Sequence, residues 1–125
     1  FTLWLSDAGA AIVSAQMNTT LAKVSTGPGY ECRGRNGDAS AKLSEHAFGN
    51  AVDISTIVTA DGRTILVSDA VVTSSAAFPL LRGLRMTACG YFSTVLGPGA
   101  NAAHASHFHF DMQLHGKSPA YRICQ

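Results

Sequence analysis

Histidines are concentrated in two short segments of this sequence. Four of the five lie within residues 104–115, and the fifth, His46, stands seven residues before Asp53. Neutral imidazole is a common metal ligand and also exchanges protons near neutral pH. The two segments are therefore the first places to look for a metal centre or for acid-base chemistry.

The segment HFHFDM, residues 107–112, alternates polar and apolar side chains. Because alternate residues of a strand share a face, His107, His109 and Asp111 point one way, while the phenylalanines point the other way. The same alternation in AVDIS, residues 51–55, separates Asp53 from its large apolar neighbours. We expect two strands that are anchored by their apolar faces and present His and Asp side chains to one cleft.

Two imidazoles and one carboxylate suit a catalytic zinc ion, which commonly has three protein ligands and a water in the fourth position. The ion lowers the pKa of that water toward about 7 and polarises a carbonyl under attack. An HxH pair alone is weak evidence, but the added pair His46 and Asp53 favours a metal site. The expected chemistry is the hydrolysis of an amide bond.

These residues resemble the motifs of a known family. Residues 44–53 match SxHxxGxAxD, the first motif of the zinc D-Ala-D-Ala peptidases, and residues 107–109 resemble the HxH motif of the same peptidases. These peptidases share a fold with lysostaphin-type enzymes and the Hedgehog signalling domain. More narrowly, YECRGRNG, LSEHAFGNAVDIS, ACGYFSTVLGPG and NAAHASHFHFDM resemble the C-terminal domain of bacterial extensin-like proteins. The resemblance implies a single domain over residues 1–125, zinc bound by His46, Asp53 and His109, and a peptidoglycan peptide as substrate.

The sequence departs from one branch of that superfamily at the catalytic base. The dipeptidases and carboxypeptidases carry a Glu three residues before the last ligand, and Ser106 stands there in this chain. His104 and His107 instead resemble the HxxHxH arrangement of the penicillin-insensitive murein endopeptidases. A neutral imidazole can accept a proton from a zinc-bound water. We therefore expect His107 or His104 to be the catalytic base.

Three further residues are candidates for substrate binding. Arg33 and Arg35 precede the first motif, where related peptidases carry an arginine that binds a substrate carboxylate or carbonyl. The alternative is that they are loop arginines paired with nearby acidic residues. Ser44 either supports His46 by a hydrogen bond or only caps its turn. His115 lies outside every motif, and we expect it to be solvated.

The elements that must position these residues follow from periodicity. Apolar spacing predicts helices over residues 7–17 and 74–89, with Pro79 tolerated in the first turns of the second helix. Alternation and turn residues predict strands over residues 19–24, 51–57, 63–67, 91–96 and 107–114, with a hairpin around Asp61 and Gly62. This order predicts an α+β fold with a small, mostly antiparallel sheet flanked by helices and a zinc cleft on one sheet face.

Composition excludes several classes of protein. The chain has 125 residues, 46% of them hydrophobic and 14% charged, which is typical of one folded domain and not of a disordered chain. The formal net charge of +1 gives no reason to expect a nucleic acid partner. No apolar run reaches the 18 to 20 residues, roughly, of a membrane span. Nothing in the sequence indicates an oligomeric state.

Three cysteines allow at most one internal disulfide. We expect Cys89, at the end of a helix, to pair with Cys124, because a bond there would prevent the chain end from fraying. Cys32 would then await a partner before Phe1, where the sequence begins like a processed or trimmed chain. Such pairing is normal in an exported protein, in agreement with a periplasmic or secreted bacterial location.

A second hypothesis keeps the metal but not the reaction. The chain would be a non-catalytic binding module, similar in logic to the Hedgehog domain. Zinc would stabilise the fold, and the cleft would bind cell-wall peptide or a protein partner. The missing Glu at position 106 keeps this alternative open.

Overall fold

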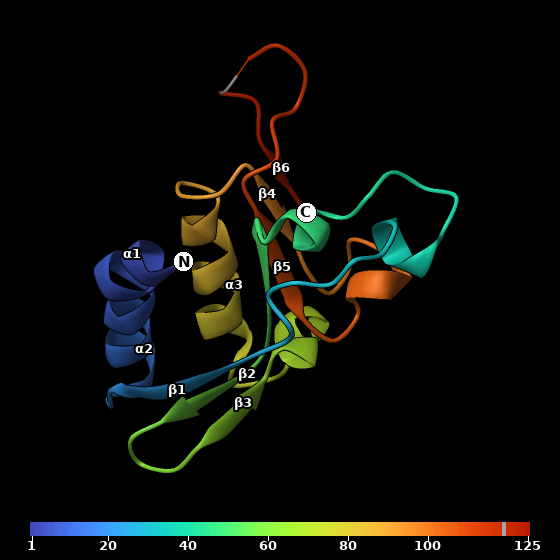
Figure 1. Ribbon diagram of the computed structural model, residues 1–125. Helices are drawn as coiled ribbons and strands as arrows, with labels where there is room; N and C mark the ends of the chain where they lie inside the picture. The colour runs from blue at the N-terminus through green and yellow to red at the C-terminus, as the bar shows by residue number, and fades with distance from the viewer. Residues whose placement is uncertain (119) are drawn as a thin grey trace.

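The computed structural model describes residues 1–118 and 120–125. Its centre is a six-stranded mixed sheet with helices against one side (Figure 1). The long segment between β1 and β2, drawn in cyan to green, lies on the other side of the sheet. The predicted α+β class is therefore confirmed, and one face of the sheet is left for the loops that carry His46.

The N-terminal helical run is longer than predicted. It comprises α1 (Thr2–Trp4), a π-helical turn (Leu5–Gly9) and α2 (Ala10–Met17), and it ends at Asn18, which is left-handed with a φ of 51°. An Asn tolerates this conformation better than most residues, so it suits a helix end. The prediction missed the first turns because they show no clear helical periodicity. Their place in the fold depends on tertiary packing, in which Trp4 is buried.

Helix α3 (Phe78–Ala88) begins later than predicted. Pro79 lies in its first turn, where a missing N–H costs no intrahelical hydrogen bond. The preceding residues 74–77 form turns and not a helix. A proline therefore marks the true start of this helix.

The long strand β2 organises the sheet. One edge of β2 (Ala51–Thr59) pairs with β1 (Leu21–Thr26). Along the other edge, the first half of β2 pairs with β5 (Phe108–Asp111) and the second half pairs with β3 (Thr64–Leu66). These pairs are antiparallel, so the predicted hairpin of β2 and β3 is confirmed. Beyond β5 come β4 (Thr94–Leu96) and β6 (Ile123–Cys124), and only the β4–β6 pair of the described sheet is parallel.

Three predicted strands are shorter in the structure, and β3 loses one residue at each end of the predicted range 63–67. Residues 91–93 continue the turns that end α3, because the N–H groups of Tyr91 and Phe92 both bond to the carbonyl of Ala88. After Asp111 the chain leaves the sheet, and the backbone of Gln113 donates to the Asp111 side chain. β6 was not predicted because two residues are too few to show a period.

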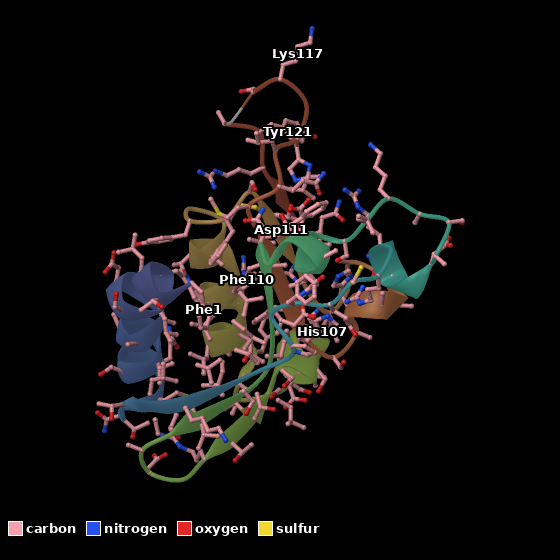
Figure 2. All side chains as sticks on the ribbon, viewed as in Figure 1. Phe1, His107, Phe110, Asp111, Lys117 and Tyr121 are labelled. Atoms are coloured by element: carbon pink, nitrogen blue, oxygen red, sulfur yellow. A yellow bond between two sulfur atoms is a disulfide. The ribbon has the colours of Figure 1, made fainter. Side chains whose placement is uncertain are left out.

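The apolar face of β5 supplies the centre of the core. Phe108 and Phe110 are buried, and Figure 2 shows Phe110 in the interior of the fold. Phe110 packs edge-on against Trp4 at a ring-centroid distance of 5.2 Å and stacks on Phe92 at 5.0 Å. Helix α3 contributes Leu80, Leu81 and Leu84 to the same core. Since neighbouring strand residues face opposite ways, this packing fixes His109 and Asp111 on the polar side.

The predicted disulfide is confirmed. Cys89 and Cys124 are bonded, with their Cα atoms 6.1 Å apart, and the bond ties β6 to the end of α3. Cys32 is exposed and has no disulfide partner in the described part of the chain. Among the helices within residues 1–118 and 120–125, none is both long and apolar enough to cross a membrane.

Candidate metal centre

Two of the predicted metal ligands lie on paired strands. Asp53 of β2 and His109 of β5 are direct cross-strand partners, so their side chains leave the same face of the sheet side by side. His46 comes from the 3₁₀ turn Glu45–Phe48, where the Ser44 hydroxyl accepts a hydrogen bond from the His46 backbone at 3.4 Å. Gly49 ends that turn in the left-handed conformation, with a φ of 63°.

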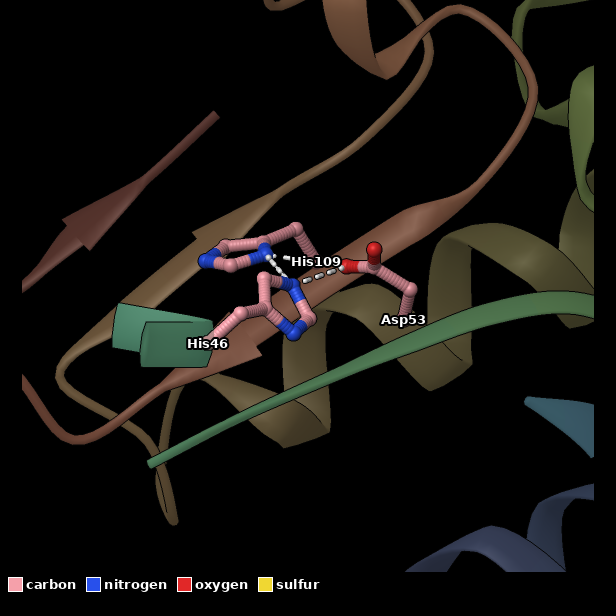
Figure 3. Close-up of side chains that lie close together, drawn as sticks. All are labelled: His46, Asp53 and His109. Carbon is pink, nitrogen blue, oxygen red and sulfur yellow. Dashed lines mark hydrogen bonds and ion pairs between the residues drawn. The ribbon is translucent and has the colours of Figure 1, made fainter. Parts of the chain in front are cut away.

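The three side chains converge on one point (Figure 3). His109 Nδ1 lies 2.9 Å from Asp53 Oδ1 and 3.2 Å from His46 Nε2, and His46 Nε2 lies 3.2 Å from Asp53 Oδ1. In a tetrahedral site with metal-ligand bonds of about 2.0–2.1 Å, neighbouring ligand atoms are about 3.3 Å apart. The observed spacing fits, so this group could hold a metal ion.

Burial of His46 supports a functional explanation of the group. The side chain is 1% exposed, and its Nδ1 atom has no hydrogen-bond partner among residues 1–118 and 120–125. An unpartnered buried polar atom costs about 1–3 kcal/mol, so stability alone does not explain a histidine here. Its other nitrogen, Nε2, faces the two remaining members of the group.

Two carboxylates beside His109 favour positive charge in this group. Burial lowers the pKa of His109, but hydrogen bonds and charges from Asp111 and Asp53 outweigh it and raise the pKa to about 9. Burial raises the pKa of Asp53, yet the hydrogen bond from His109 and the neighbouring imidazoles bring it below its usual value. A metal ion would replace protons in this negative environment.

The two candidate bases lie beside the group. His107 precedes β5, and its Nε2 atom is 3.7 Å from Asp53 Oδ2. His104 is buried, with its ring centroid 5.3 Å from that of His107 and 5.4 Å from that of His109. Burial and these two imidazoles lower the pKa of His104 to about 4, so it is neutral at pH 7. Its Nδ1 lies 2.7 Å from the side-chain oxygen of Asn101.

The group opens on a cleft of about 540 Å³. Arg33, Arg35 and Ser44 all line it together with the histidines. Arg33 also pairs with Glu31, and the Arg35 guanidinium donates to the Gln113 side chain at 3.0 Å. The structure therefore combines both interpretations of these arginines, since each has a local partner and borders the cleft.

One expectation is wrong. His115 is half-buried and lines the cleft, with its Nε2 atom 2.8 Å from Thr94 Oγ1. No local pattern in the sequence places it there, because the contact with Thr94 forms only when the chain after β5 folds back toward β4. Thr94, Asn101 and Gln113 also line the cleft and were not predicted, because their side chains are brought to it only in the folded chain. The alternation in HFHFDM placed Asp111 on the correct face, but it did not reveal the contact with His109.

Fold and site together define a small α+β domain with a possible His/Asp metal centre in an open cleft. The comparison with protein families gives a more specific result. The family described as extensin-like protein C-terminus matches residues 1–125, and the chain belongs to that family. No curated protein and no solved structure matches the chain.

Proposed function

We propose that this protein is a zinc-dependent peptidase that hydrolyses an amide bond in peptidoglycan peptides. The observation that carries the proposal is the spacing of 2.9–3.2 Å between the ligand atoms of His46, Asp53 and His109. Their site lies in a cleft that is large enough for a peptide segment. The motifs at residues 44–53 and 107–109 further support a relationship to the zinc D-Ala-D-Ala peptidases, and we propose that residues 1–125 form one such domain.

The donor set is chemically suited to zinc. Imidazole and carboxylate are both zinc ligands, and three protein ligands are typical of catalytic zinc sites. When bound, zinc supplies a Lewis acid and a water of lowered pKa. The residues of the chain would hold that ion, bind the peptide and move protons.

Proton transfer falls to an imidazole in this proposal, and either His107 or His104 can serve. His107 is nearer to the ligand Asp53, and its side chain remains partly exposed to the cleft. His104 is neutral at pH 7, but its pKa of about 4 makes it a weak proton acceptor. Arg33 and Arg35 would bind a substrate carboxylate or carbonyl, while Ser44 would hold the turn that carries His46.

The test measures metal content and reaction on the same samples. Purified protein is analysed for zinc and then incubated with purified peptidoglycan, and the released muropeptides are separated. His107→Ala and His104→Ala are compared with the parent. Loss of the base should lower turnover by about 100-fold to 10,000-fold and leave the zinc content nearly unchanged. If neither variant slows a parent that is active, the imidazole assignment is wrong.

The alternative function is a zinc-stabilised module that binds cell-wall peptide or a protein without cleaving it. The specific observation in its favour is Ser106, which is exposed and occupies the position of the Glu base of related enzymes. A zinc-loaded parent that sediments with peptidoglycan of several types but releases no fragment would establish this function. A disulfide in the fold supports a periplasmic or secreted location in either case.

A further inference from the structure

A buried carboxylate lies directly behind one of the proposed ligands. Asp111 is the last residue of β5 and is 4% exposed. Its Oδ2 atom lies 3.0 Å from His109 Nε2, the ring nitrogen that faces away from His46 and Asp53. One imidazole therefore lies between the ligand group and a second carboxylate.

The Asp111 side chain is itself held in place. Its Oδ1 atom accepts a hydrogen bond of 2.9 Å from the backbone N–H of Gln113, which leaves Oδ2 for His109. Residue 111 is also paired in the sheet, with Ala51 on one side and Thr94 on the other. The carboxylate cannot move away from His109 without breaking the turn that ends β5.

A metal ligand must present a bare nitrogen. His109 offers Nδ1 to the group, so in a metal-bound state the single ring proton must lie on Nε2. A carboxylate only accepts hydrogen bonds, and it therefore stabilises the tautomer that carries the proton on Nε2. Contacts of this kind also fix the orientation of the ring.

We propose that Asp111 is a positioning residue whose hydrogen bond to Nε2 of His109 selects the tautomer and ring orientation that leave Nδ1 free for the metal ion. This inference rests on the proposed metal centre, but not on the peptidase reaction. It adds to the three ligands a residue that acts through His109 without touching the ion.

The substitution Asp111→Asn separates this role from a purely structural one. If the amide oxygen keeps the bond to the Gln113 N–H, the amide NH₂ group faces His109 Nε2 and donates to it. The ring proton must then move to Nδ1, where it blocks the metal. If the amide turns around, its NH₂ group meets the Gln113 N–H, and two donors face each other.

The substitution Asp111→Ala has a different effect. It removes the acceptor but leaves His109 free to adopt either tautomer, so metal binding is weakened and not blocked. A structural role predicts that Asn, which keeps the shape of Asp, is the milder change. The positioning role predicts that Asn lowers metal affinity more than Ala does.

The experiment measures zinc affinity by competition with a chromogenic chelator for the parent, Asp111→Ala and Asp111→Asn. Loss of a residue that orients a ligand typically costs about 10-fold to 100-fold in affinity, which we expect for Ala, with a larger loss for Asn. Asp61→Asn, which removes an exposed carboxylate in the β2–β3 hairpin, is the control and should bind zinc like the parent.

Nitrogen NMR of His109 gives a second readout. The zinc-loaded parent should show the ring proton on Nε2, and Asp111→Asn at the zinc concentration that just saturates the parent should show it on Nδ1. Parent-like affinity in both variants, or a milder loss in Asn than in Ala, would overturn the inference even if the parent binds zinc. A parent without zinc affinity would instead refute the proposed metal centre. Melting of each metal-free variant identifies misfolding, and if Ala does not fold, the NMR result for Asn decides.

Discussion

Removal of Asp53, a proposed ligand, should remove most of the stabilisation that bound zinc would give to the fold. The three ligand atoms come from β2, β5 and the turn before β2, so they are brought together only in the folded chain. An ion that binds only the folded state adds about 2.7 kcal/mol when its free concentration is 100 times its Kd. For 125 residues at about 2.1 cal/mol/K each, the unfolding entropy is about 0.26 kcal/mol/K. The melting temperature should therefore rise by about 10 °C.

The assay compares each variant with its own metal-free form in calorimetry. This comparison removes the change that Asp53→Ala makes to the metal-free protein by breaking the hydrogen bond to His109. If the variant binds 100-fold more weakly, the same zinc concentration adds only about 0.4 kcal/mol, or about 2 °C. Asp61→Asn should keep the full increment. An increment of about 10 °C that survives in Asp53→Ala would show that zinc binds elsewhere.

Three further predictions concern the fold. The Cys89–Cys124 bond spans 35 positions, so the chain-entropy account expects its reduction to lower the free energy of unfolding by about 4 kcal/mol. Urea unfolding with and without reductant measures this change, and equal midpoints would contradict it. Gly97→Ala should destabilise the fold by about 1–3 kcal/mol, because the added Cβ would lie 2.6 Å from a ring atom of Phe108. An unchanged melting temperature would show that the Phe108 ring can move aside without cost. Hydrogen bonds from Arg63 and Thr59 lower the pKa of Asp61 to about 2. The contribution of Asp61 to stability is therefore complete above about pH 4 and is lost as the pH falls toward 2. An NMR titration of Asp61 with a midpoint near 3.8 would refute these contacts.

Local periodicity predicted the parts of the site that depend on one strand. Alternation in HFHFDM separated His109 and Asp111 from the buried phenylalanines, and the structure agrees. The pairing of Asp53 with His109 is different, because a register between strands distant in sequence is set by turns and packing. The expectation that His46, Asp53 and His109 form one group therefore came from the family motifs, because strand periodicity does not indicate which distant residues meet.

Residues positioned by irregular backbone could not be predicted in the same way. His115 reaches Thr94 only because the chain after β5 turns back along β4, and no period describes such a segment. Asn101 caps the short 3₁₀ turn Ala102–His104 and contacts the His104 ring, a role that its position in a polar loop does not reveal. The loops around a regular sheet thus contain most of the unpredicted contacts.

The core enforces the geometry of the proposed metal centre. A slip of one residue between β2 and β5 would turn Phe108 and Phe110 toward the cleft and His109 into the apolar interior. Each phenylalanine would lose about 1.5–3 kcal/mol of burial, and the imidazole would lose its hydrogen-bond partners in the core. The hydrophobic face of β5 therefore selects the single register in which Asp53 and His109 are neighbours. His46 lies instead in a turn that Ser44 caps and Gly49 ends, so the register of the strands does not set its position.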